Sequence, residues 1–84
     1  MKIKDFKRIE FTFIDLLGDT SWAEESEFRK MECSTCSGVG YLFHKDNKVV
    51  MTFASYDADK EGNILAYGDR NIIPTSCITK IKYI

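Results

Sequence analysis

The feature that most constrains the fold is an alternation of apolar and polar residues with a period of two, which recurs in short runs along the chain. Within residues 6–17, Ile9, Phe11 and Phe13 are separated by polar or charged neighbours. Successive side chains of a β-strand point to opposite faces, so this run predicts a half-buried strand. The same period returns in residues 33–44 and 49–56, on either side of a polar turn, and predicts a hairpin.

The remaining sequence adds further short strands. A polar loop, DADKEGN, leads into ILAYG and then RNII, and CITKIKYI closes the chain after the single proline. About five short strands in so small a chain predict a mainly β (β-rich α+β) fold. They favour a small five-stranded sandwich or barrel over a layered α/β fold.

One short helix is expected after the first strand, at residues 22–31. Ser21 and Glu24 have the spacing of a capping box, and the acidic residues of this segment precede its basic ones, as the helix dipole favours. The apolar contacts of the helix would come from Trp22, Phe28 and Met31.

Length and charge exclude several classes of protein. With 84 residues, the chain is expected to form a single domain, residues 1–84. The net charge of -1 argues against a nucleic-acid partner or an anionic membrane surface. No apolar run approaches the roughly 18 residues of a membrane span, and the start of the chain does not have the pattern of a signal peptide. Three cysteines, an odd number, fit a reducing cytoplasm.

Cys33 and Cys36 have the Cys-x-x-Cys spacing that can bind a metal or exchange disulfides. If both lie on one strand, however, their thiols point to opposite faces, and their Cα atoms lie about 10 Å apart, beyond the roughly 7 Å limit for a disulfide. A structural zinc site usually takes two close pairs of ligands, and only His44 and Cys77 remain. We therefore expect no metal and no cofactor, with a zinc-stapled module as a further alternative.

Residues 57–68 imitate a calcium loop. Asp57, Asp59 and Glu61 stand at its first, third and fifth positions and Gly62 at the sixth, but Gly68 replaces the bidentate glutamate of the twelfth. Strand patterns flank the loop where an EF-hand requires helices, so we expect a solvated hairpin loop.

No catalytic residues are expected. The single histidine, His44, cannot be paired with a nucleophile from the sequence, and the glycines at 38 and 40 lie inside a strand pattern without the lysine of a phosphate loop. These glycines instead indicate a bulge or a close backbone crossing. The protein is thus expected not to be an enzyme.

Three candidate binding residues are basic. Lys80 and Lys82 would join the lysines of the N-terminus in one basic edge if the first and last strands pair. Such an edge could contact an acidic partner, or it could protect the sheet from aggregation, and the second interpretation is favoured. Arg70, in the loop Asp69-Arg70-Asn71, could bind a phosphate.

The ending NIIPTSCITKI resembles the ending of SH3-like barrels: an apolar strand, a proline that opens a one-turn 3₁₀ helix, and a short strand with Ile78 and Ile81. The resemblance covers about the last dozen residues and implies the barrel fold. The acidic-aromatic motif and the paired tryptophans of the peptide-binding members are missing, so proline-motif binding is not implied.

Most of the chain is also similar to small uncharacterised proteins encoded by bacteriophages. The shared elements are a tryptophan after the first turn (Trp22), the strand VGYLFH, a strand that ends in ASY, and an Ile-Pro-x-x-x-Ile close. This resemblance implies a small accessory protein in an infected bacterium, and therefore in the host cytoplasm. Trp22 is a fourth candidate binding residue, and the resemblance brings no catalytic residues.

Two classes of function follow. The preferred one is a non-enzymatic interaction protein that binds a host protein and could inhibit a host defence factor. The alternative is a homo-oligomer that binds a small ligand or nucleotide in a pocket between its protomers, with Arg70 at the phosphate.

Overall fold

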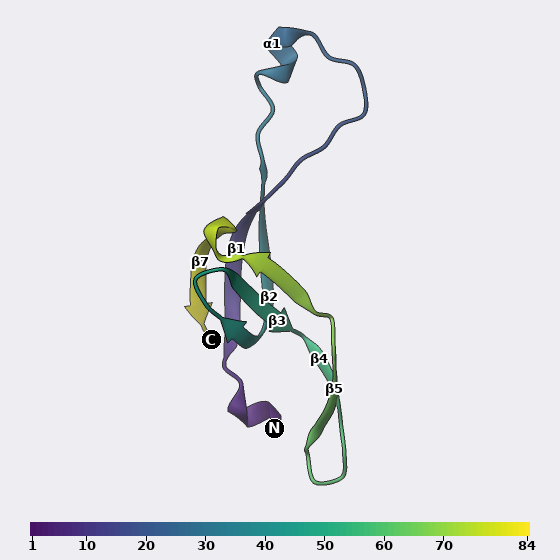
Figure 1. The fold of residues 1–84 in the computed structure, drawn as a ribbon, viewed down its shortest axis with the longest axis vertical. Coiled ribbons are helices and arrows are strands. Elements are labelled where there is room, and N and C mark those ends of the chain that lie inside the picture. The colour runs from purple at the N-terminus through teal and green to yellow at the C-terminus, as the bar shows by residue number, and fades with distance from the viewer.

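The computed structural model describes all residues, 1–84, and is mainly β, as predicted (Figure 1). In chain order the elements are η1 (Ile3–Asp5), β1 (Arg8–Asp15), α1 (Glu25–Phe28), β2 (Ser34–Lys45), β3 (Val49–Phe53), β4 (Ser55–Ala58), β5 (Ile64–Gly68), β6 (Asn71–Pro74), η2 (Thr75–Cys77) and β7 (Ile78–Tyr83). The prediction of about five strands was too low. The strand pattern after Val49 is divided at Ala54, and β4 leaves the main sheet to pair with β5.

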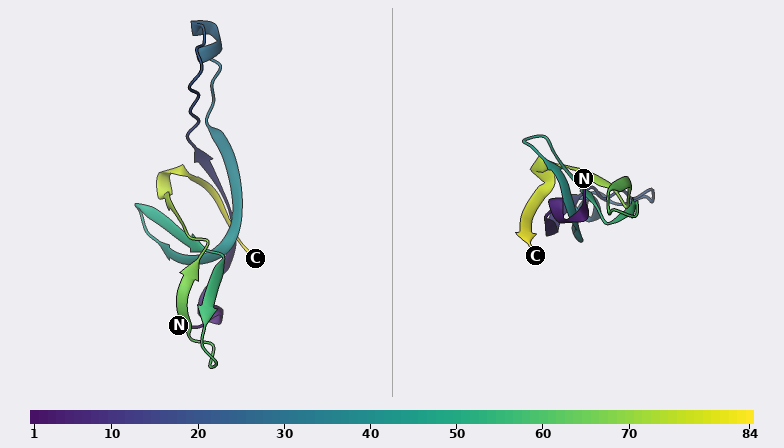
Figure 2. Two further views of the ribbon diagram at one scale, coloured as in Figure 1. Left: turned by 90° about the vertical axis from the view of Figure 1, so that its right-hand side faces the viewer. Right: turned by 90° about the horizontal axis from the view of Figure 1, so that it is seen from below.

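Five strands form one antiparallel sheet in the order β6-β3-β2-β1-β7, and β4 and β5 form a second sheet of two strands. The first and last strands pair, with Phe11 opposite Ile81, which meets the condition under which the sequence places the basic residues of both ends at one edge. The predicted closed barrel is not found. The edge strands β6 and β7 are not hydrogen-bonded to each other, so the sheet stays open, although it curves strongly (Figure 2).

The core lies under the curve of this sheet and is small, since 7 of the 84 residues are buried. Its apolar members are Ile9, Phe11, Val50, Phe53 and Ile73. The alternation of β1 was interpreted correctly, because Ile9 and Phe11 face inward from it. Complete burial of side chains of this size contributes about 1.5–3 kcal/mol each to folding.

Gly38 and Gly40 of β2 allow two close approaches inside the sheet, as their position in the strand pattern predicted. A Cβ atom at Gly38 would lie 2.7 Å from Cζ of Phe11, and one at Gly40 would lie 2.9 Å from the carbonyl oxygen of Phe53. The buried ring of Phe11 and the backbone of β3 occupy the space of the missing side chains.

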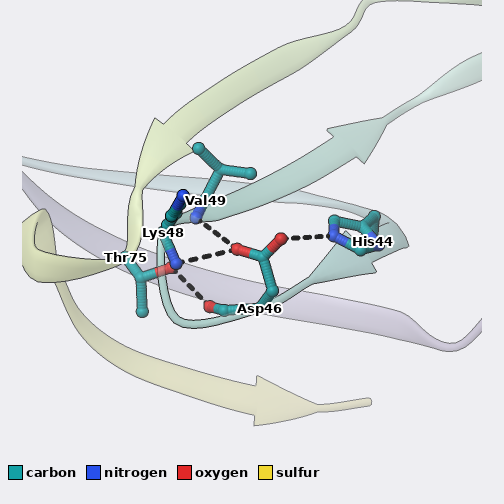
Figure 3. Close-up of polar contacts among 5 residues, drawn as sticks. All are labelled: His44, Asp46, Lys48, Val49 and Thr75. Carbon is teal, nitrogen blue, oxygen red and sulfur yellow. Dashed lines mark hydrogen bonds and ion pairs between the residues drawn. The ribbon is translucent and has the colours of Figure 1, made fainter.

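The turn between β2 and β3 is held by Asp46 (Figure 3). Its Oδ1 accepts hydrogen bonds from the backbone N–H groups of Lys48 at 2.7 Å and Val49 at 2.8 Å. The hydroxyl of Thr75, in η2, donates to the Asp46 carbonyl oxygen at 2.8 Å. These hydrogen bonds close the predicted hairpin and link it to η2. The position of this 3₁₀ helix, directly after Pro74, is the one that the resemblance to SH3-like barrels implied.

The segment that imitates a calcium loop forms the β4–β5 hairpin, as expected. Oδ1 of Asp59 accepts hydrogen bonds from the N–H groups of Glu61 at 3.0 Å and Asn63 at 2.8 Å. Gly62 has a φ of 85°, a left-handed conformation that glycine adopts without strain. These backbone hydrogen bonds hold the pKa of Asp59 below its ordinary value.

The helix prediction was wrong in extent. In place of residues 22–31, α1 covers only Glu25–Phe28, with Glu24 and not Ser21 at its N-cap. Ser21 instead donates its N–H and its hydroxyl to Oδ1 of Asp19, at 2.8 and 2.6 Å. This local turn takes the side chain that a capping box would need, so the helix begins later.

Candidate functional site

Residues 16–33, between β1 and β2, form a projection that we call the arm. At its base Asp15 and Ser34 are partners in the register of the two strands. The arm leads away from the sheet to α1, at the upper end of the molecule in Figure 1. The molecule is elongated as a result and measures 59 × 22 × 21 Å along its principal axes. None of the arm's residues is buried.

The arm exposes large apolar side chains. Trp22 is fully exposed, at 101% of its reference area, and Phe28 is 67% exposed. Leu16, Leu17 and Met31 are also exposed. Trp22, Phe28 and Met31 border a shallow hollow of the arm together with the polar residues Asp19, Ser21 and Glu27. The placement of Trp22 in the helix was therefore wrong, but its selection as a candidate agrees with this exposure.

The arm is also acidic. It carries five carboxylates against two cations, Arg29 and Lys30. One carboxylate, that of Glu25, lies 2.8 Å from the Arg29 guanidinium in an exposed pair, which stabilises a helix by only a few tenths of a kcal/mol. The hydrogen bonds from Ser21 hold the pKa of Asp19 below its ordinary value. Apart from Glu25, the carboxylates of the arm form no ion pair within the chain.

A second feature, which we call the aromatic recess, lies where β2, β3, β5 and β6 meet. It is an open hollow of about 200 Å³ lined by Phe43, Met51, Thr52, Phe53, Tyr67, Arg70 and Asn71. The rings of Phe43 and Tyr67 are 5.1 Å apart and those of Phe53 and Tyr67 are 4.8 Å apart, both edge to face. Phe6 completes this cluster from the N-terminal segment, 5.0 Å from Phe53.

The register of β2 breaks at Phe43, which lines the recess. Leu42 pairs with Thr52 and His44 with Met51, so Phe43 has no partner across the ladder. Such a bulge rotates a side chain out of the regular alternation. The sequence predicted Phe43 on the same face as Tyr41, and both rings contact Phe53, at centroid distances of 6.3 and 5.4 Å. Nothing in the sequence marks the bulge itself.

The mouth of the recess is set by the link between β5 and β6. Asp69 has a φ of 50°, in the left-handed region, which asparagine and aspartate tolerate best among residues with a side chain. The Ser55 hydroxyl donates to Oδ2 of Asp69, and the Ala54 N–H donates to the carbonyl oxygen of Gly68 at 3.2 Å. These contacts hold the link across the start of β4, so that Arg70 lies at the edge of the apolar hollow.

Arg70, predicted as an anion-binding residue, therefore borders a recess, and its guanidinium forms no ion pair within the chain. Lys80 and Lys82 lie elsewhere, on the edge strand β7, where Lys82 is opposite Glu10 in the register. Their exposure on an edge strand fits the protective role that the sequence favoured. The four predicted site residues thus lie in three separate places.

The cysteines do not gather. All three are free, Cys33 is exposed outside β2 and Cys36 is half-buried within it. No three histidine, cysteine, aspartate or glutamate side chains come together in a way that could hold a metal ion. The geometry therefore gives the zinc-stapled alternative no support.

Comparison of the chain with protein-family models, with curated proteins and with solved structures found no match. None of the helices has the length and apolar character needed to cross a membrane. Two features of the chain suit binding. These are an acidic arm with an exposed tryptophan, and an aromatic recess with an unpaired cation at its mouth.

Proposed function

We propose that the protein is a non-enzymatic interaction protein of the bacteriophage accessory type, which binds a bacterial host protein through the arm. Inhibition of a host defence factor is the proposed consequence. One observation carries the proposal: Trp22, the only tryptophan, is completely exposed on an element that extends away from the sheet. A partner that covers it would remove from water the most unfavourably placed side chain of the molecule.

The energetics of interfaces support this use of Trp22. Tryptophan is enriched among the residues that dominate binding, and truncation of such a residue costs about 2 kcal/mol or more. Phe28 and Met31, beside it, provide further apolar area, and the surrounding carboxylates suit a docking site with a basic rim. The arm contributes nothing to the core, so it can adjust to a partner without disturbing the fold.

We further propose that the fold is SH3-like. The order of β6, Pro74, η2 and β7 supports this proposal, since it is the proline, 3₁₀ helix and short strand of the resemblance. In this view, the sheet is a small scaffold, and the arm is the element adapted to a partner.

The test is capture of host proteins from a bacterial lysate on the immobilised protein, compared with a Trp22→Ala variant. We expect a specific host protein on the wild type and its loss with Trp22→Ala. Leu65→Ala is the matched control, because Leu65 is 65% exposed but lies on β5, away from the arm. The captured protein is then purified and its binding to the wild type and both variants is measured directly.

Capture that persists in Trp22→Ala would contradict the assignment of the arm as the binding element. Repeated failure to recover any specific host protein would contradict the proposed function itself. Inhibition of a defence factor is tested by the activity of the captured protein, with and without the wild type.

The aromatic recess favours a second candidate function, the binding of a small anionic ligand or nucleotide. Arg70 supplies a free cation, and Phe43 and Tyr67 supply faces on which a base could stack. At about 200 Å³ the recess is smaller than typical small-molecule pockets of about 300–1,000 Å³, so a second protomer would complete it. A nucleotide that binds must raise the unfolding temperature at saturating concentration, and the absence of any shift would rule it out.

A further inference from the structure

The aromatic recess and the arm each have side chains without a partner in the chain, and the two sets are chemically complementary. The recess has apolar walls and an unpaired guanidinium at its mouth, from Arg70. The arm has an exposed indole with an unpaired carboxylate two residues away, in Trp22 and Glu24. Aromatic rings pack edge to face or offset, and arginine binds both carboxylates and the face of an indole, so each feature suits the other.

The volume of the recess indicates the size of its occupant. About 200 Å³ accommodates a single large side chain, and beyond Tyr67 and Arg70 the recess continues into a more open hollow of about 500 Å³ that leaves room for the chain on either side of that residue. The polar groups at the mouth, Arg70 and Asn71, leave the apolar hollow formed by Phe43, Phe53 and Tyr67 for a ring.

The arm of the same copy does not reach this recess. The arm extends from the sheet in one direction, whereas β5, which carries Tyr67, extends toward the opposite end of the molecule (Figures 1 and 2). A contact between Trp22 and the recess therefore requires two copies.

We infer that the protein associates with itself by placing Trp22 of one copy in the aromatic recess of a second copy, with Arg70 of the second copy facing Glu24 of the first. In an antiparallel dimer, each copy offers its arm to the other, and both contacts form at once. The distribution of charge favours this arrangement. The arm has five carboxylates against two basic side chains, whereas the rest of the chain has ten basic side chains against eight carboxylates.

The experiment is multi-angle light scattering and sedimentation equilibrium of the full chain over a range of concentrations. Because Trp22 is the only tryptophan, its fluorescence reports the same contact. We expect the mass to rise from monomer to dimer with concentration, and the emission to shift to the blue over the same range. Trp22→Ala should weaken association at least about 30-fold, as removal of a dominant interface tryptophan does.

Charge reversal tests the second contact. Arg70→Glu and Glu24→Lys should each weaken association, and the double variant should restore it toward the wild-type value. Both residues are exposed, so neither change threatens folding. Lys60→Glu, which changes the net charge of the chain by the same amount at the tip of the β4–β5 hairpin, is the control and should leave association unchanged.

A mixture of two defective variants tests whether the tryptophan of one copy enters the recess of another. Trp22→Ala keeps an intact recess and Arg70→Glu keeps an intact tryptophan, so a mixture should form a mixed dimer with a blue-shifted emission that neither variant gives alone. A chain that stays monomeric up to millimolar concentration would overturn the inference. So would association that Trp22→Ala leaves unchanged, or a double charge variant that is no tighter than the single ones.

Self-association and host-protein binding both use Trp22 and therefore compete for it, but the experiments distinguish them. Host-protein binding requires the arm alone, so Arg70→Glu, which frees Trp22 from a dimer, would leave it intact or strengthen it, whereas self-association requires both the arm and the recess. A monomeric protein that still captures a host partner would overturn only the self-association, and a dimer without a host partner would overturn only the proposed function.

Discussion

His44 and Asp46 form a contact across the start of the β2–β3 turn, with Nε2 of His44 2.7 Å from Oδ2 of Asp46 (Figure 3). Together with the backbone donors of Lys48 and Val49, the His44 side chain lowers the pKa of Asp46 from 3.8 to about 2. The same carboxylate therefore closes the hairpin and holds an imidazole at its entrance.

The first prediction concerns the pH dependence of this contact. Because the pKa of Asp46 is lower in the folded state, its charged form stabilises the fold fully above pH 3.8, and this contribution is lost as the pH falls toward 2. Asp46→Asn keeps a carbonyl oxygen for Lys48 and Val49 but has no charge to titrate. In urea unfolding followed by far-ultraviolet circular dichroism, the stability difference between wild type and variant should narrow from pH 4 to pH 2. A constant or widening difference would contradict this assignment.

The second prediction concerns Phe53, which links the core to the aromatic recess. Its ring is 1% exposed and contacts Tyr41 and Tyr67 at centroid distances of 5.4 and 4.8 Å. Phe53→Ala should lower the free energy of unfolding by about 3–5 kcal/mol, as loss of a buried phenylalanine does. Phe28→Ala removes the same group from the arm and should change it by less than about 0.5 kcal/mol. Equal effects at the two positions would show that the arm packs on the core.

The third prediction concerns the close approach at Gly40. A methyl group there meets the carbonyl oxygen of Phe53, and backbone does not move aside as the end of a flexible side chain can. Gly40→Ala should therefore destabilise the protein by about 1–3 kcal/mol. Gly18 has open space around it and no positive φ, so Gly18→Ala should be neutral or stabilise by up to about 1 kcal/mol. Chemical denaturation measures both, and a neutral Gly40→Ala would mean that the two strands are further apart.

The strands that depend on local periodicity could be predicted from the sequence. The alternation of Ile9, Phe11 and Phe13 correctly placed β1, and Pro74 correctly placed the 3₁₀ helix before the last strand. Each of these signals is contained in a few adjacent residues. The open sheet was not predictable in the same way, because closure depends on whether β6 and β7, far apart in the sheet order, come into hydrogen-bonding distance.

The candidate site was predicted only in part. Trp22 and Arg70 were selected, but the helix expected around Trp22 gave way to a turn in which Asp19 binds Ser21. Phe43 of β2 and Tyr67 of the separate β4–β5 hairpin meet at a centroid distance of 5.1 Å, and no local pattern encodes that meeting. The recess is thus a product of tertiary structure, whereas its cation was visible in the sequence.

The final prediction tests whether the arm is independent of the fold. Asp15 and Ser34 are partners in the β1–β2 register, so a two-residue Asn-Gly turn can replace residues 16–33 and continue the hairpin. Because no residue of the arm is buried, we expect cooperative unfolding to persist. Stability should be unchanged or higher by up to about 2 kcal/mol, since a shorter loop costs less entropy to close.

The shortened protein should at the same time lose capture of a host partner and self-association, which both require Trp22. Thermal unfolding and circular dichroism check the first expectation, and the lysate capture and light scattering check the second. A shortened chain that no longer folds would show that the arm stabilises the sheet through contacts absent from this structure. A shortened chain that folds and still binds its partner would place the binding surface on the sheet itself.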